Sequence, residues 1–159
     1  MPSDAEPNWL DDREQTAWRK VVAGTTLLLE DLDRDLRTAH DLTLADYEIL
    51  VHLSEAPDHR LRMNELADRA LVSRPRLTHR VNRMQARGLV EREACADDRR
   101  GTFAVLTPAG RELLIDAAPT HVAGVRRLVV DRMTTRQLEQ LGEYLGRIAL
   151  AAGSASDQL

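Results

Sequence analysis

Arginines dominate the sequence between positions 73 and 87, and no acidic residue interrupts them. The five are Arg74, Arg76, Arg80, Arg83 and Arg87. A solvated helix surface usually mixes both signs of charge and pairs Glu with Lys or Arg, which this stretch does not do. Because guanidinium groups pair with phosphates and base edges, the stretch is a candidate nucleic-acid contact, with a simple solvated helix as the alternative.

Residue types suited to catalysis or metal binding show no comparable pattern. The five histidines do not form a ligand spacing such as HExxH, and a single cysteine excludes a CxxC pair. The sequence also has no phosphate-binding glycine loop. We therefore expect no enzyme activity, no metal site and no cofactor.

The basic stretch is predicted to be a helix with one buried face. Ser73 is a suitable N-cap, Pro75 falls in the first turn, and Gly88 provides a left-handed stop. Leu77, Val81 and Met84 follow the i, i+4, i+7 spacing of one apolar face. The opposite face is predicted to carry Pro75, Arg76, His79, Asn82 and Arg83.

Further elements surround this helix in an ordered set. Met63–Ala70 is predicted to be a short preceding helix, with Leu66 and Ala67 facing inward. Two strands, Leu89–Cys95 and Thr102–Leu106, bracket a tight basic turn that contains Asp98, Arg99 and Arg100. A helix, a turn, a basic helix and a basic hairpin predict a winged helix-turn-helix, a mainly α fold with a small β-wing.

The same stretch resembles the MarR family of bacterial transcription regulators. The resemblance rests on Leu66-Ala67, the Ser73-initiated helix, residues 87–92, and Asp98-Arg99-Arg100 followed by Leu106-Thr107-Pro108-Ala109-Gly110. It extends from about Glu14 to Ala149. It implies a homodimeric repressor that binds double-stranded DNA. It also implies a third wing strand at Arg60–Arg62.

The outward residues of the basic helix divide into two expected roles. Arg76 and His79 are expected to read bases, whereas Ser73, Arg74 and Thr78 are expected to contact phosphates, with Pro75 and Arg83 on the same surface. The resemblance further implies that Arg99 enters the minor groove while Asp98 and Arg100 brace the wing.

The long helices at both ends of the chain predict the domain organisation. We expect a flexible segment at 1–10, a dimerisation region formed by 11–40 and 112–152, a winged helix-turn-helix at 43–111, and a flexible tail at 153–159. A helix as long as 11–40 cannot bury its apolar face within so small a domain. Its stripe and that of Leu138, Leu141, Leu145 and Ile148 are therefore expected to meet a second copy.

The distribution of charge along the sequence supports a DNA-binding role for the winged helix-turn-helix. The net charge is −4, but residues 60–111 carry 12 basic and 6 acidic side chains, for a local charge of +6. Phosphate binding responds to this local field more than to the total. No apolar run approaches a membrane span of about 20 residues, and the acidic start does not resemble a signal peptide. A cytoplasmic protein without a membrane partner is expected.

The family resemblance also implies a crevice for a small aromatic acid or phenol. Trp18, Tyr47, His52 and His121 lie on helices expected to border it, although Trp18 and the two histidines are also plausible structural residues. Cys95 is expected to be a half-buried strand residue, with an oxidant-sensing role as the alternative. The remaining functional alternative is an interaction module that keeps the fold without binding DNA.

Overall fold

The elements follow the order expected of a winged helix flanked by long helices. The computed structural model describes residues 6–95 and 98–153, and the side chains of residues 98–100 lie outside this description. The elements are α1 (Asp12–His40), α2 (Leu44–Glu55), η1 (Pro57–His59), β1 (Arg60–Arg62), α3 (Met63–Arg69), α4 (Arg74–Ala86), β2 (Val90–Cys95), β3 (Asp98–Leu106), α5 (Pro108–Leu128), η2 (Val130–Arg132) and α6 (Thr135–Ala151). The described part is thus mainly helical with one small sheet, which confirms the predicted fold class.

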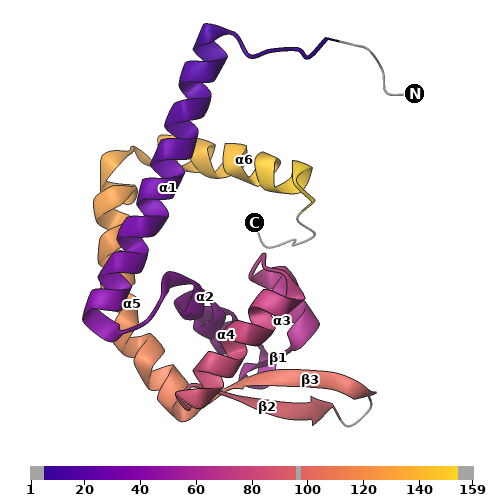
Figure 1. The fold of residues 1–159 in the computed structure, drawn as a ribbon. Coiled ribbons are helices and arrows are strands. Elements are labelled where there is room, and N and C mark those ends of the chain that lie inside the picture. The colour runs from indigo at the N-terminus through magenta and orange to yellow at the C-terminus, as the bar shows by residue number, and fades with distance from the viewer. Residues whose placement is uncertain (1–5, 96–97, 154–159) are drawn as a thin grey trace.

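Helices α1 and α5 lie side by side and form the long arm of the molecule (Figure 1). Arg127 of α5 forms ion pairs with Asp31 and Asp35 of α1, at 2.8 and 2.7 Å. Near the other end of the contact, His40 of α1 lies 3.0 Å from Asp116 and 2.8 Å from Thr120, both on α5. These pairs fix the second half of α1 along the length of α5.

Helix α5 changes geometry near its C-terminal end. It ends at Leu128, and a 3-10 turn, η2, follows. Pro119 lies inside the helix, which continues across it. The chain leaves α-helical geometry only at Val129, whose φ and ψ are −126° and −66°.

The hydrophobic core lies beneath the winged unit. Its fully buried side chains come from the end of α1, the α1–α2 loop, helices α2, α3 and α4, and the sheet; the largest are Leu36, Leu42, Ile49, Leu50, Leu53, Leu66, Leu77, Val81, Met84 and Val90. The predicted inward positions Leu66 and Ala67 are both buried. The apolar stripe of α4 is therefore confirmed as its core-facing side.

The wing is a three-stranded antiparallel sheet with the order β1-β3-β2. Strand β1 pairs with β3 in the register Arg62↔Phe103, which confirms the third strand expected at Arg60–Arg62. Strand β3 begins at Asp98 rather than at Thr102, because pairing with β2 extends out to Cys95↔Asp98 across an irregularity after Ala94. The hairpin is consequently longer than the residue types alone suggested.

The first half of α1 and all of α6 remain outside this core. Every residue of α1 before Leu28 is exposed, and no residue of α6 is buried. Figure 1 shows α6 turning away from the end of α5. Trp18 is 56% exposed in the single chain, so an assignment to the core is wrong.

Candidate nucleic-acid interface

Helix α4 separates its apolar and polar residues onto opposite faces. Leu77, Val81 and Met84 are at most 1% exposed. The other side presents exposed Ser73, Arg74, Pro75, Arg76, Thr78 and His79. Packing of the stripe therefore turns six of the predicted DNA-contacting residues toward solvent on one rigid helix.

The beginning of α4 departs from the predicted cap. Ser73 occupies the N-cap position with extended backbone, but its side chain makes no capping hydrogen bond. Pro75 lies in the first turn, where its missing N–H costs nothing. Because the Ser73 hydroxyl is not used by the helix end, it can donate to a phosphate oxygen.

The base of the wing is fixed to the end of α4 and the start of α5. Gly88 adopts φ +72°, as expected of a left-handed stop. The Thr107 hydroxyl donates to the carbonyl of Gly88 at 2.7 Å and accepts from the Gly110 N–H at 3.0 Å. A Cβ on Gly110 would lie 2.1 Å from the Leu89 carbonyl oxygen, so only glycine permits this approach. Within the segment Leu106-Thr107-Pro108-Ala109-Gly110, these contacts explain why a threonine stands at 107 and a glycine at 110.

The outer part of the wing carries the predicted tip residues. Asp98, Arg99 and Arg100 belong to β3 by their backbone, but their side chains lie outside the described part of the structure. Their roles as brace and minor-groove contact stay predictions. Cys95 lies in β2 as expected, but at 6% exposure it is buried rather than half-buried.

Hollows flank α4 on both sides. One of about 540 Å³ separates α4 from the α1–α2 junction and is lined by Asp33, Arg37, Thr43, Ala45, Pro75, Arg76, His79, Arg80 and Arg83. The other, of about 340 Å³, lies toward the wing and is lined by Arg62, Met63, Asn64, Thr78, Arg92, Gly101 and Thr102. Sequence reasoning missed Arg37, Arg62 and Arg92, whose placement beside α4 depends on tertiary packing.

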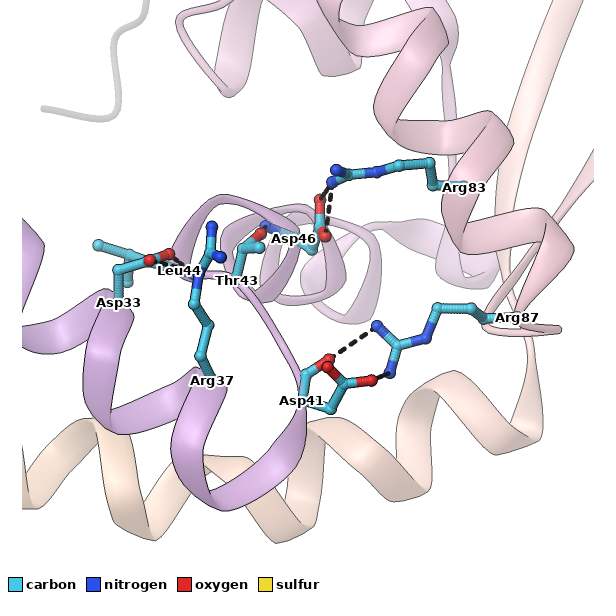
Figure 2. A network of polar contacts seen from close by, with 8 residues as sticks. All are labelled: Asp33, Arg37, Asp41, Thr43, Leu44, Asp46, Arg83 and Arg87. Carbon is cyan, nitrogen blue, oxygen red and sulfur yellow. Dashed lines mark hydrogen bonds and ion pairs between the residues drawn. The ribbon is translucent and has the colours of Figure 1, made fainter.

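Two arginines at the end of α4 contact acidic residues of the α1–α2 junction (Figure 2). Arg83 Nη2 donates to both carboxylate oxygens of Asp46, at 3.2 and 3.0 Å. Arg87 Nη1 donates to the main-chain carbonyl of Asp41 at 2.8 Å, and its Nη2 lies 3.6 Å from the carboxylate. Arg83 was predicted to contact DNA, and the structure gives its guanidinium a partner within the protein.

The residues predicted to border an effector crevice are only partly brought together. Tyr47 and His121 stack with their ring centroids 4.6 Å apart. Trp18 precedes the first buried residue of α1, Leu32, by 14 positions, which is roughly 21 Å along a helix. His52 is half-buried on the same helix as Tyr47, five residues away and therefore on another face. A single chain thus supplies the Tyr47–His121 pair but not Trp18.

Burial shifts the pKa values of His121, His52 and Tyr47. It lowers the pKa of His121 below 6.5, and it does the same for His52, where Arg69 adds to the effect and Glu55 opposes it. Burial also raises the pKa of Tyr47 above 10.0. The Nδ1 atom of His121 is buried and has no hydrogen-bond partner among the described residues. The unpartnered Nδ1 of His121 therefore lies beside the ring of Tyr47.

The described part of the chain contains neither a metal-binding cluster nor a membrane-spanning helix. Among residues 6–95 and 98–153, no cluster of three or more His, Cys, Asp or Glu side chains could hold a metal ion. In the same part of the chain, no helix combines the length and apolar character needed to cross a membrane.

Comparison with known proteins agrees with the geometry of α4 and the wing. A family model described as MarR family matches residues 40–101. A crystal structure of Sco3205, a MarR family transcriptional regulator from Streptomyces coelicolor in complex with DNA, superposes with a TM-score of 0.90. The two chains are 43% identical, and the match covers 94% of this chain and 97% of that one.

Two curated relatives give the same result. The HTH-type transcriptional regulator MhqR of Bacillus subtilis is 30% identical over 105 residues, covering 66% of this chain and 68% of MhqR. The homoprotocatechuate degradative operon repressor of Escherichia coli is 29% identical over 126 residues, covering 79% of this chain and 83% of the repressor. With the exposed basic face of α4 set on a winged fold, these matches show that the chain belongs to the MarR family of transcriptional regulators.

Proposed function

We propose that this regulator acts as a homodimeric repressor that binds a pseudo-palindromic operator and is released by a small aromatic or phenolic effector. The observation that carries the DNA-binding part is the division of α4 into a fully buried stripe and an exposed face of arginines, Thr78 and His79. Because operator DNA lies in the cytoplasm of a bacterium, we propose that location as well.

The roles on α4 follow from where the side chains project. Arg76 and His79 lie one turn apart near the start of the helix, and helix-turn-helix proteins use such positions to read base edges. Ser73, Arg74 and Thr78 flank them, and their donors suit phosphate oxygens. Pro75 completes the exposed surface at the first turn.

The wing is proposed to supply the second DNA contact. Arg99 inserts into the minor groove, while Asp98 and Arg100 brace the hairpin. Arg99→Ala should abolish tight binding and leave the melting temperature almost unchanged, because a surface arginine contributes little to folding. Asp98→Ala should lower both. Gel-shift titration and thermal melts of the two variants check this, and a fall in melting temperature for Arg99→Ala alone would reverse the roles.

Dimerisation is supported by the apolar residues that the single chain leaves uncovered. Val21, Val22 and Leu29 of α1, with Leu145 and Ile148 of α6, are all at least 40% exposed. Large exposed apolar surfaces usually mark an interface, and a second copy with the same two stripes supplies a matching one. Two-fold pairing would set the α4 helices about 34 Å apart, or roughly 10 base pairs.

Repression and the effector class rest on the relatives and on Tyr47. The relative from Escherichia coli is a repressor of an operon that degrades homoprotocatechuate. The stacked Tyr47 and His121 rings offer an aromatic wall with the His121 nitrogen as a polar group, and His52 lies on the neighbouring face of α2. Trp18 could border the same crevice only across the dimer interface. Effector binding releases DNA only if it favours a dimer with wrongly spaced α4 helices.

Selection of DNA fragments from random pools tests the proposal. The selected site should be a pseudo-palindrome, and its affinity should fall steeply with salt as phosphate contacts release counterions. Calorimetry with salicylate on the wild type, Trp18→Ala and His121→Ala then tests the crevice. Failure to select any sequence would favour an interaction module that does not bind DNA, and unchanged salicylate affinity in both variants would move the crevice elsewhere.

A further inference from the structure

The side chains that join the recognition helix α4 to the α1–α2 junction by polar contacts lie at its C-terminal end. Its N-terminal turn carries Arg74 and Arg76 on the exposed face, whereas its last turns carry Arg83 and Arg87, one turn apart on one side. Both of these arginines contact the α1–α2 junction (Figure 2). We call the pairs Arg83–Asp46 and Arg87–Asp41 the helix clamp.

In the Arg83–Asp46 pair of the clamp, the carboxylate of Asp46 is buried, and the pair therefore favours one orientation of α4. Asp46 is 4% exposed, and both of its carboxylate oxygens accept hydrogen bonds from Arg83. A buried carboxylate without a cation would be costly, so the pair strongly favours the orientation of α4 in which Arg83 reaches it. Arg83 therefore acts through Asp46 to hold the helix.

The Asp41 half anchors the clamp to the end of α1. Asp41 is the C-cap of α1, in left-handed geometry, and its main-chain carbonyl accepts from Arg87. That carbonyl is part of the backbone at a helix end, so it moves only when α1 moves. The clamp thus has one attachment on α2 and one on α1.

The junction itself is fixed to the long helices. Asp33 of α1 accepts from the Leu44 N–H at 2.9 Å, which joins the start of α2 to α1. His40 joins the end of α1 to Asp116 and Thr120 of α5. A continuous series of polar contacts therefore runs from α5 through α1 and the α1–α2 junction to α4.

We infer that the helix clamp makes Arg83 and Asp46 positioning residues, which fix α4 relative to the long helices and so make DNA binding depend on the spacing of the two half-sites. The inference rests on the proposed dimer, because the long helices are where two copies would meet. On this inference, Arg83 holds the recognition helix in the position needed for base contacts and does not itself contact a phosphate.

The test compares a selected operator with the same operator carrying one extra central base pair. The insertion separates the half-sites by about 3.4 Å and rotates them by about 35°. A rigidly held pair of helices should lose at least about tenfold in affinity. The variants are Arg83→Gln, Arg87→Gln and Asp46→Asn/Arg83→Gln, the last of which leaves no uncompensated buried charge.

We expect the clamp variants to bind the two operators within about threefold of each other, with the slope of affinity against salt unchanged. The double variant should match Arg83→Gln, because the two residues act as one unit. Arg69→Gln is the control: it breaks the pair with Glu65 inside α3 and should keep the full spacing preference. Melting curves establish that each variant is folded at the assay temperature.

The possible outcomes distinguish failure of the helix clamp from failure of the proposed dimeric operator complex. If the wild type showed no spacing preference, the dimeric operator complex and the clamp would both be wrong. If the wild type showed it and the clamp variants kept it in full, the clamp inference alone would fail. A salt slope reduced by about one in Arg83→Gln, with equal losses on both operators, would make Arg83 a phosphate contact and overturn its positioning role.

Discussion

Helices α4 and α6 carry the same kind of amphipathic pattern but have opposite surroundings. In α4 the stripe of Leu77, Val81 and Met84 is buried within its own chain. In α6 the corresponding stripe leaves Leu145 40% and Ile148 57% exposed. Periodicity therefore identifies the face that needs a partner, but the partner can be the same chain or another copy. The comparison separates a winged unit whose helical stripe is covered by its own chain from an arm whose stripe is exposed in the single chain.

The buried stripe should respond to truncation with the largest loss of stability. Met84→Ala removes a 1%-exposed side chain from the winged core and should cost about 2–5 kcal/mol of unfolding free energy. Asn82→Ala, on the exposed side of the same helix, should stay within about 0.5 kcal/mol. Chemical denaturation measures both. A cost for Met84→Ala that vanished on dilution would place that stripe in an interface and erase the distinction.

The exposed stripe should respond through association. Ile148→Glu places a charge on the proposed interface and should leave a monomer at micromolar concentration by light scattering. Operator affinity should then fall by roughly 10²-fold, because two linked half-site contacts exceed a single contact by at least that factor. Arg136→Glu, on the polar side of α6, is the control. A dimeric Ile148→Glu would show that the arm pairs through another surface.

A smaller effect is expected on the exposed face of α4. Arg76→Ala should weaken operator binding by about 1–3 kcal/mol and relax the preference at particular base pairs. The unfolding free energy should hardly change, in contrast with Met84→Ala. Binding measured on a panel of single-base operator variants tests this. Equal weakening on every sequence would reassign Arg76 to a phosphate.

The smallest expected effect concerns pH and the Tyr47–His121 pair. Burial lowers the pKa of His121 in the folded state below the value of 6.5 for an unperturbed histidine. Above pH 6.5 the imidazole is neutral in both the folded and the unfolded chain, so it does not change the free energy of unfolding. As the pH falls below 6.5, the unfolded chain takes up the proton first, and the free energy of unfolding decreases until the pH has passed the folded pKa. His121→Phe should therefore flatten the fall in stability below pH 6.5. His79→Phe on exposed α4 is the control, and identical profiles for wild type and His121→Phe would exclude the effect.

The elements themselves were largely predictable because their ends carry local signals. Asp11, Thr43, Thr107 and Thr134 each accept a backbone hydrogen bond at the start of a helix, as their short polar side chains favour. Ser73 was the exception, since its position was right but its hydroxyl makes no cap. Local chemistry decides where a helix begins, and side-chain use at that point depends on neighbours.

The parts of the site that escaped prediction depend on residues far apart in the sequence. Asp46 and Arg83 are 37 positions apart, and nothing in either neighbourhood indicates that they meet. The turn of Arg92 toward the Thr78 carbonyl, 14 positions away, is of the same kind. The roles of Asp98, Arg99 and Arg100 concern side chains outside the described part, so they stay predictions. Sequence patterns indicate faces and ends, whereas pairings across the fold require the packing of every element between them.

The hydrogen bonds of Thr107 at the base of the wing have a consequence for how such regulators diverge. Its hydroxyl bridges Gly88 and Gly110, so the two strand ends are held where the hairpin leaves the body. Adding or removing residues in pairs between the strands would preserve the alternation of side chains and change only how far the hairpin extends. The length of the wing can therefore change without disturbing its attachment at Gly88 and Gly110.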